Sequence, residues 1–249
     1  MTNNNLTALI TRPEPYGQRL AQQLNQANVA TVCQPVFSYQ SSSETFDDTL
    51  TEYAIVIFVS VAAVNYGAHQ LSSLKGTSHS PQIFAVGKAT QAALATQGIS
   101  AISPTHHSTE GLLALELLAR DNINGKRILI VRGDGGRECL ASGLRSRGAI
   151  VNYWECYQRV WLDLPDDIAQ IWQQNKVNCI IITSNNILKY VVNLLKRADN
   201  YWENNGILVV ASERIAQAAK AHGFHHIINA QGANDEAIVS AIRNIGTKT

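Results

Sequence analysis

Short β-branched runs alternate along the chain with segments whose apolar residues recur at helical spacing. Several runs are apolar throughout, as in residues 54–60 (AIVIFVS) and 177–183 (VNCIIIT). Continuous apolar character suits strands that are buried on both faces, as in a parallel sheet. The alternation therefore predicts an α/β protein with parallel sheets flanked by helices. The candidate strands are 6–11, 29–37, 54–60, 82–86, 127–131, 150–160, 177–183, 207–210 and 225–229.

The chain also repeats itself with a shift of about 120 residues. Residues 8–24 align with residues 128–144, so that Arg12 falls on Arg132. Ordered self-similarity of this kind is the signature of duplicated structural units, and we expect two similar α/β domains. Later matches in the same order pair Ser60 with Ser184 and residues 83–99 with residues 208–224.

Composition and charge exclude several functional classes. The 249-residue chain is 45% hydrophobic and 16% charged, which suits well-packed cores. A net charge of +1 provides no field that would recruit nucleic acid or an anionic membrane. The longest apolar stretch, 54–64, is shorter than the ~20 residues that span a bilayer, and the N-terminus lacks the features of a signal peptide. With four scattered cysteines as reduced thiols, we expect a cytoplasmic protein without nucleic-acid or membrane partners.

Recognisable metal and nucleophile motifs are missing from the sequence. The adjacent pairs His106-His107 and His225-His226 would point to opposite faces of a strand, and no zinc-binding spacing occurs. We therefore expect no metal. A G-x-S-x-G elbow is also absent. Tyr157, near the end of a candidate strand, is a possible proton donor, although a tyrosine in a strand usually serves packing.

Polar, glycine or basic residues follow the candidate strands. In open α/β sheets, ligands bind beyond the carboxyl ends of strands, where helix N-termini present free N–H groups. Each hydroxyl or amide taken alone is better explained as a helix cap, and each arginine is equally explained by an ion pair. Together, in two similar halves, the junctions predict a cleft that binds an anion. The candidate binding residues are Arg12, Ser60, Gly87, Lys88, Thr90, Arg132, Gly133, Arg137, Thr183, Ser184, Asn185 and Ser212.

The glycine-rich turn in residues 127–140 (RILIVRGDGGRECL) has the layout of a phosphate-binding loop but not its spacing. Gly133, Gly135 and Gly136 do not form G-x-G-x-x-G, and no G-x-x-x-x-G-K-[ST] motif occurs. The turn permits close backbone approach, with Arg132 and Arg137 beside it. An organic anion is therefore favoured over a nucleotide.

These segments, in this order, resemble the uroporphyrinogen-III synthase family over nearly the whole chain. The resemblance is carried by ITRPEPYGQRLAQQL, IFVSVAAV, FAVGKATQAAL, STEGLL, ILIVRGDGGRECLASGLRSRGAIVNYWECYQRV and ILVVASERIAQAAKAHGF. It implies a cofactor-free lyase of tetrapyrrole biosynthesis. Such an enzyme cyclises hydroxymethylbilane, a linear tetrapyrrole with eight carboxylates, with loss of water and inversion of the last pyrrole ring.

The resemblance also implies a domain arrangement. Residues 1–36 and 162–249 would form one discontinuous α/β domain, and residues 37–161 the other. A two-stranded β-ladder would join them, with the active site in the interdomain cleft. The resemblance implies a monomer whose substrate is a linear tetrapyrrole, with the hydroxymethylbilane-producing enzyme as a possible protein partner.

By the same resemblance, Tyr157 takes the position of the family's proton-donating tyrosine and Thr90 that of its cleft threonine. Ser60, Thr183 and Ser184 match its Thr/Ser junctions. The chain departs from the family at Val59, where a threonine is common, and at 212–215, where a glycine-containing turn is common. The alternative function is a non-enzymatic two-domain protein that closes on a small organic anion. A nucleotide- or sugar-phosphate-processing enzyme is disfavoured because the phosphate motifs are missing.

Overall fold

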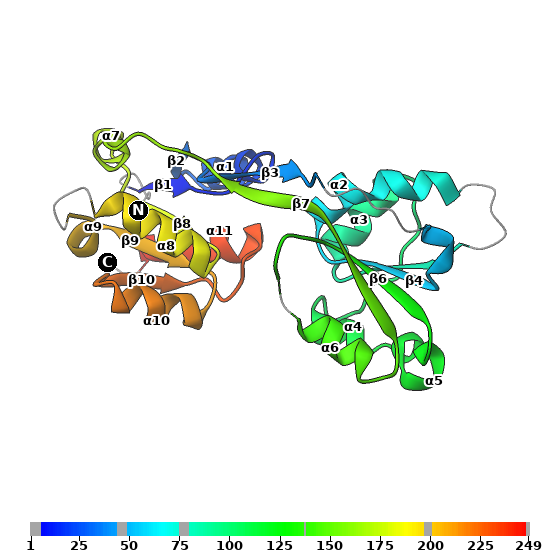
Figure 1. The fold of residues 1–249 in the computed structure, drawn as a ribbon. Coiled ribbons are helices and arrows are strands. Elements are labelled where there is room, and N and C mark those ends of the chain that lie inside the picture. Colours follow the sequence, from blue (N-terminus) through cyan, green and yellow to red (C-terminus); the bar gives the residue numbers. More distant parts are fainter. Residues whose placement is uncertain (1–5, 44–48, 75–79, 137, 197–200, 248–249) are drawn as a thin grey trace. The chain divides into compact units, whose positions relative to one another are not determined.

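The computed structural model describes residues 6–43, 49–74, 80–136, 138–196 and 201–247. Contacts within the chain define two compact units (Figure 1). Unit 1 consists of Met1–Ser38 together with Val160–Thr249, and unit 2 consists of Tyr39–Arg159. The chain thus begins unit 1, completes unit 2 and returns to finish unit 1.

Unit 1 is built on a five-stranded parallel sheet. Its strand order is β10-β9-β8-β1-β2, and every neighbouring pair runs parallel. Parallel neighbours require crossover connections, and helices supply them. The strands are β1 (Thr7–Ile10), β2 (Ala30–Cys33), β8 (Cys179–Ile182), β9 (Ile207–Val210) and β10 (His226–Asn229); the helices are α1 (Tyr16–Gln26), α7 (Ile168–Gln174), α8 (Asn185–Leu195), α9 (Tyr201–Asn205), α10 (Glu213–Ala221) and α11 (Asp235–Arg243).

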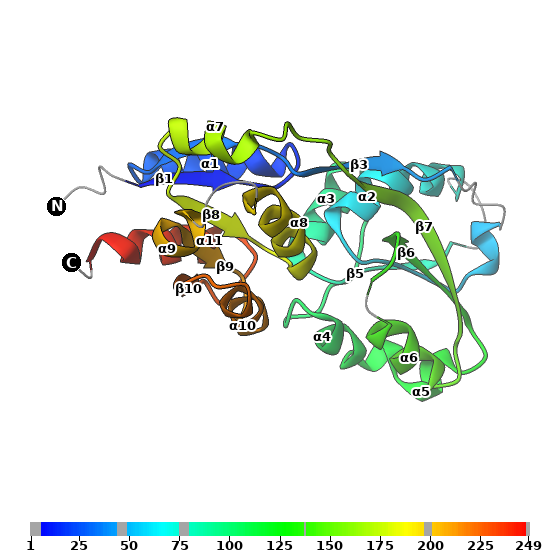
Figure 2. The same ribbon diagram turned by 60° about the vertical axis from the view of Figure 1, so that its left-hand side comes forward.

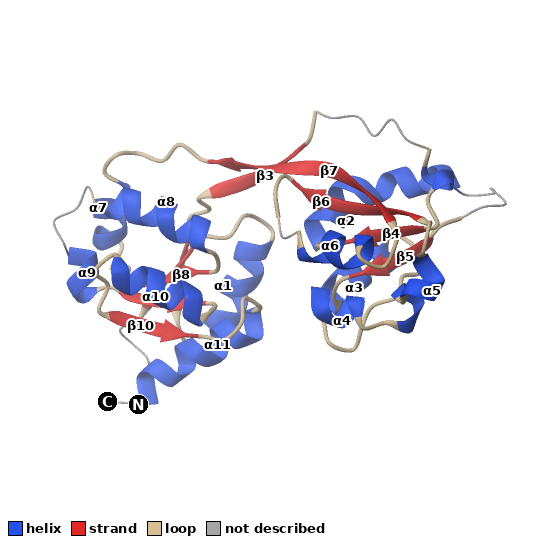
Figure 3. Cartoon of the chain, turned by 60° about the horizontal axis from the view of Figure 1, so that its bottom comes forward, coloured by secondary structure: helices blue, strands red, loops and turns tan. Residues whose placement is uncertain are grey.

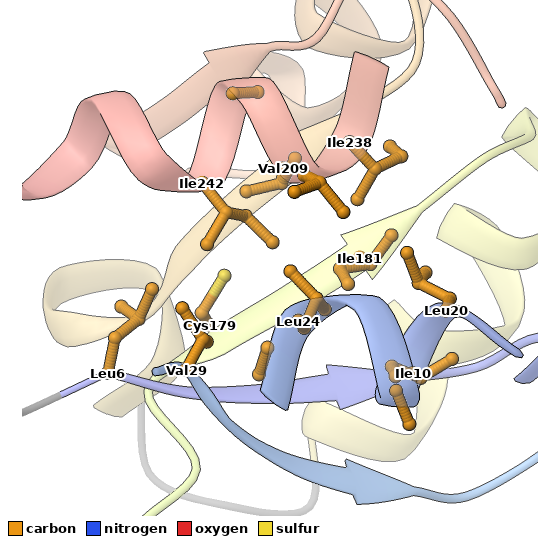
Figure 4. Close-up of a cluster of buried hydrophobic side chains, with 14 residues drawn as sticks. Leu6, Ile10, Leu20, Leu24, Val29, Cys179, Ile181, Val209, Ile238 and Ile242 are labelled. Carbon is orange, nitrogen blue, oxygen red and sulfur yellow. The ribbon is translucent and has the colours of Figure 1, made fainter. Parts of the chain in front are cut away.

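One face of this sheet is covered by α1 and α11. Leu20 and Leu24 of α1 and Ile238 and Ile242 of α11 pack with strand residues such as Ile181 (Figure 4). These five side chains are fully buried. Burying each one stabilises the unit by about 1.5–3 kcal/mol, so the apolar stripes of the two helices fix them to the sheet.

Unit 2 contains a second five-stranded sheet with the order β3-β7-β6-β4-β5. The pairs β7–β6, β6–β4 and β4–β5 are parallel. The strands are β3 (Phe37–Ser41), β4 (Ile55–Phe58), β5 (Gln82–Ala85), β6 (Arg127–Gly133) and β7 (Ile150–Trp161); the helices are α2 (Val61–Gly67), α3 (Lys88–Thr96), α4 (Thr109–Leu113), α5 (Arg120–Ile123) and α6 (Cys139–Arg145).

Helices lie on both faces of the second sheet (Figure 2). On one face, Val64 of α2 and Leu94 of α3 belong to a buried cluster with Phe58. On the other, Leu112 of α4 and Leu144 of α6 belong to a second cluster. The predicted α/β class with parallel sheets flanked by helices is therefore confirmed.

Strands β3 and β7 form the only antiparallel pairing in the described strands, and both carry the chain between the units (Figure 3). Their opposite directions follow from two bonds, Ser42 N–H to the Cys156 carbonyl and Leu162 N–H to the Val36 carbonyl. The candidate strand 29–37 is in fact split into β2 and β3. Pro35 lies in the gap, where it has no N–H to continue a ladder.

The sequence repeat corresponds to a structural repeat. The segment β1–α1–β2 of unit 1 has the same order as β6–α6–β7 of unit 2. In the sheets, β2-β1-β8-β9 corresponds to β7-β6-β4-β5. Residues aligned by the repeat, including Arg12 with Arg132, therefore follow equivalent strands or end them.

In unit 1, Arg12 joins the end of β1 to the start of α11. Its guanidinium pairs with the Asp235 carboxylate at 2.5 Å and donates to the Ala233 carbonyl. Arg19 of α1 donates to the second Asp235 oxygen at 2.7 Å. Arg12 is 11% exposed at its side chain and Asp235 is 7% exposed, so water screens their attraction poorly. One carboxylate thus ties together the β1 end, α1 and α11.

We predict that Asp235→Ala strongly destabilises unit 1 because it leaves the buried Arg12 charge without its partner. The expected loss in the free energy of unfolding is about 3–5 kcal/mol, measured by urea denaturation. Glu236→Ala is the matched control, since Glu236 is the next residue in the same helical turn and is exposed. Equal losses for the two variants would show that the Arg12–Asp235 pair does not hold unit 1 together.

Candidate functional site

Tyr157 lies near the carboxyl end of β7, where that strand pairs with the end of β6. Its partner across the pair is Gly133. The Tyr157 ring also meets the Tyr39 ring edge-on, with centroids 5.1 Å apart and an interplanar angle of 83°. The Tyr66 ring, from α2, lies 5.7 Å away at an interplanar angle of 33°. The phenol is therefore held between β6, β3 and α2.

Ser60 connects this phenol to the start of α2. It is the N-cap residue of α2, and its Oγ accepts the Ala63 N–H at 3.0 Å. The same Oγ lies 3.1 Å from Tyr157 Oη, and either hydroxyl can donate in that bond. When Ser60 donates, the phenol keeps its own proton for a third group. The Ala63 N–H, the Ser60 hydroxyl and the Tyr157 hydroxyl are thus linked in one hydrogen-bonded chain.

The environment keeps Tyr157 in its acid form. Burial raises the pKa of Tyr157, and the hydrogen bond with Ser60 opposes that shift. Because the pKa stays above the ordinary tyrosine value of about 10, the phenol is protonated at neutral pH. A group in this state can act as a general acid.

A second junction of unit 2 contains three predicted binding residues. Gly87 precedes α3 in an extended conformation, and Lys88, the first residue of that helix, is exposed. Thr90, in the first turn, is 5% exposed. A free helix N-terminus beside a lysine can attract an anion.

Arg132 is engaged by acidic neighbours. Its guanidinium donates to Glu155 at 3.0 and 3.1 Å and to Glu138 at 3.0 Å, and it lies 4.0 Å from the Tyr153 ring centroid. Hydrogen bonds from Tyr153 and Arg132 lower the pKa of Glu138, which keeps this carboxylate charged. Arg132 thus belongs to a local ion-pair network. Arg137 lies outside the described residues.

The junctions of unit 1 are mainly helix caps. Ser184 accepts the Ile187 N–H at 3.3 Å, and Thr183 precedes it at the end of β8. Asn185 has a buried Oδ1 without a hydrogen-bond partner among the described residues. Ser212 occupies the N-cap position of α10, but its side chain makes no capping bond. Arg12 is held by Asp235, as described above.

The structure therefore brings Ser60, Gly133 and Tyr157 together, while Arg12 and Arg132 are held by carboxylates. Sequence reasoning missed Tyr39 and Tyr66. An aromatic residue in a strand or helix usually serves packing, so no local signal distinguished them.

The described residues contain neither a metal-binding cluster nor a membrane-spanning helix. No three His, Cys, Asp or Glu side chains there are grouped so that they could hold a metal ion. Within the same ranges, none of the helices has the length and apolar character needed to cross a bilayer.

Comparison with known proteins identifies the family. Residues 18–240 match the family described as uroporphyrinogen-III synthase HemD. The chain is 34% identical to uroporphyrinogen-III synthase of Salmonella typhimurium over 248 residues, covering 96% of this chain and 100% of the relative. It is 31% identical to the Escherichia coli protein of the same name over 247 residues, with 96% and 100% covered.

Solved structures of the same name share the fold. The uroporphyrinogen-III synthetase of Helicobacter pylori has a TM-score of 0.59 at 14% identity, covering 97% of this chain and 99% of that one. A mutant enzyme from Thermus thermophilus has a TM-score of 0.57 at 10% identity, covering 98% and 100%. The family match and the two bacterial relatives together show that the chain belongs to the uroporphyrinogen-III synthase family.

Proposed function

We propose that the chain is a hydro-lyase that cyclises hydroxymethylbilane to uroporphyrinogen III, with loss of water and inversion of ring D. The observation that carries the proposal is the Ser60–Tyr157 pair at the strand ends of unit 2, in a chain of this family. The pair supplies a protonated phenol where a ligand of an α/β sheet would bind.

The first chemical step fits the phenol. Breaking the C–O bond of the terminal hydroxymethyl group requires a proton on the leaving oxygen, and Tyr157 supplies it, so that water departs. The Ser60 hydroxyl, 3.1 Å away, stabilises the resulting phenolate by donating to it. Ring closure then releases a proton from the attacked pyrrole carbon, which restores the phenol. No cofactor is needed to balance the reaction.

Substrate conformation is the second requirement. The unassisted reaction closes the ring without inversion, so the enzyme must hold the bilane in a geometry that favours the spiro route. The strand-to-helix junctions of both units are the proposed contacts for its carboxylates. Helix N-termini carry about half a positive charge each, so α3 and α8, whose first turns contain no acidic residue, can attract carboxylates in a chain of net charge +1. Lys88 adds an exposed cation at α3.

The direct test supplies hydroxymethylbilane and identifies the cyclised isomer by chromatography. We expect uroporphyrinogen III to form faster than the uninverted isomer forms without enzyme. If only the uninverted isomer appears, at the uncatalysed rate, the chain does not catalyse this reaction.

We predict that Tyr157→Phe lowers kcat roughly 100-fold or more, because the variant removes the proposed general acid. KM should change little, since the ring remains. Tyr53→Phe is the matched control: Tyr53 is a buried tyrosine of the same unit, and its hydroxyl lies 3.3 Å from Arg127. A wild-type kcat for Tyr157→Phe would leave that residue a packing role only.

The variant Ser60→Ala distinguishes the role of Ser60 as a helix cap, measured by stability, from its proposed role in catalysis, measured by kcat. Loss of the cap should cost about 1 kcal/mol of stability. We expect kcat to fall as well, because the phenolate loses its donor. Ser108→Ala is the control, since Ser108 caps α4 through the Gly111 N–H at 3.0 Å. If both variants keep wild-type kcat, Ser60 acts only as a cap.

A further inference from the structure

Strand β7 changes the face on which its side chains lie just before Tyr157. Val151 and Tyr153 pack on the face covered by α4 and α6, whereas Trp154 and Cys156 pack on the face of α2. Side chains of a regular strand alternate between faces, so Tyr157 would return to the α4 and α6 face. Instead it packs on the α2 face, as Cys156 does.

A shift in register between β6 and β7 explains this change. Arg132 is paired with Glu155, but the next residue, Gly133, is paired with Tyr157. Cys156 is thus an extra residue on β7, and a bulge of this kind re-aims the side chain that follows it. Pairing continues beyond the bulge, because the Asp134 N–H donates to the Tyr157 carbonyl at 2.9 Å. The re-aimed phenol meets Ser60, the N-cap residue of α2.

The absence of a side chain at position 133 makes room for the ring. A Cβ built on Gly133 would lie closer than 3.0 Å to three carbons of the Tyr157 ring. Real Cβ atoms essentially never approach other atoms so closely, so one of the two groups would have to move. Gly133 is not among the residues with positive φ, so alanine could adopt its backbone conformation. The position therefore requires glycine for space.

Two further tyrosines lie against the Tyr157 ring and restrict its movement. Tyr39 meets Tyr157 edge-on, and Tyr66 lies against it at a tilt. The Tyr66 hydroxyl donates to the Tyr39 carbonyl at 2.8 Å, and this hydrogen bond links the two tyrosines to each other. A ring displaced by a methyl group at 133 cannot move freely and keep its 3.1 Å contact with Ser60.

We propose that Gly133 is a positioning residue for Tyr157. The absence of a Cβ at Gly133 and the adjacent register shift together place the phenol within hydrogen-bond distance of Ser60. This assignment differs from a direct contact of Gly133 with substrate. Its kinetic part rests on the proposed function, and its structural part does not.

The structural part is tested by a stability cycle that needs no substrate. Gly133→Ala should lower the urea midpoint of unfolding, and the same change in a Tyr157→Ala background should have almost no effect, since the ring is gone. Gly143→Ala is the matched control. Gly143 lies in α6 of the same unit, and a Cβ built on it would lie 2.7 Å from Leu113 Cδ1 of α4, so its effect should be equal in both backgrounds.

If Gly133→Ala alone fails to fold, the double variant still decides. If Gly133→Ala/Tyr157→Ala folds with the same stability as Tyr157→Ala, the proposal is supported. If the double variant does not fold, the proposal is overturned. Equal losses from Gly133→Ala in both backgrounds also overturn it, because the methyl group would then clash with something other than the ring.

The kinetic part uses hydroxymethylbilane. Gly133→Ala should lower kcat roughly 10- to 100-fold with little change in KM, because a displaced acid misses its target. In a Tyr157→Phe background it should cause no further loss of kcat. If the kcat of the double variant instead falls by the product of the two single losses, Gly133 acts on the substrate directly, and the positioning role is overturned. If Tyr157→Phe keeps wild-type kcat, the acid role fails, and the stability cycle alone decides whether Gly133 sets the ring.

Discussion

Both sheets are built mainly from parallel strands, and this pairing determines where their helices begin. Two parallel strands cannot be joined by a tight turn, so each strand is followed by a crossover, in most cases a helix. In each unit the parallel strands therefore end along one edge of the sheet. Ser60, Gly87 and Ser184 stand at such ends because a helix begins at the next residue. The residues that cap these helices are consequently the residues that a ligand would meet.

Features that depend on local sequence were predictable. Apolar runs gave the strands, and hydroxyl residues after them gave the caps Ser60 and Ser184. Contacts between residues distant in the chain were not predictable from local sequence. Arg12 pairs with Asp235, 223 residues away, and nothing near Arg12 in the sequence indicates that partner. Ser60 and Tyr157 are 97 residues apart, and their contact depends on a one-residue shift in register that no local pattern encodes.

The two repeated arginines show how duplication preserves a position while its partners change. Arg12 is held by a carboxylate from α11, and Arg132 by carboxylates from β7 and from the residue before α6. Both arginine side chains are about nine-tenths buried. Each compensates acidic groups within its own unit, so much of the remaining capacity for an anion lies in neutral backbone donors. This agrees with a chain whose net charge is only +1.

The discontinuity of unit 1 has a consequence for biosynthesis. Strand β1 pairs with β2 and with β8, and α1 packs against α11. The ribosome makes β1, α1 and β2 first, and then all of unit 2, before β8 and α11 exist. About 145 residues separate the end of β2 from the start of β8. At roughly 5–20 residues per second, the apolar faces of the first segment therefore wait roughly 7–30 seconds for their partners. During that interval unit 2 can complete its own sheet, so the insertion that separates the two parts of unit 1 also sets the order in which the two units mature.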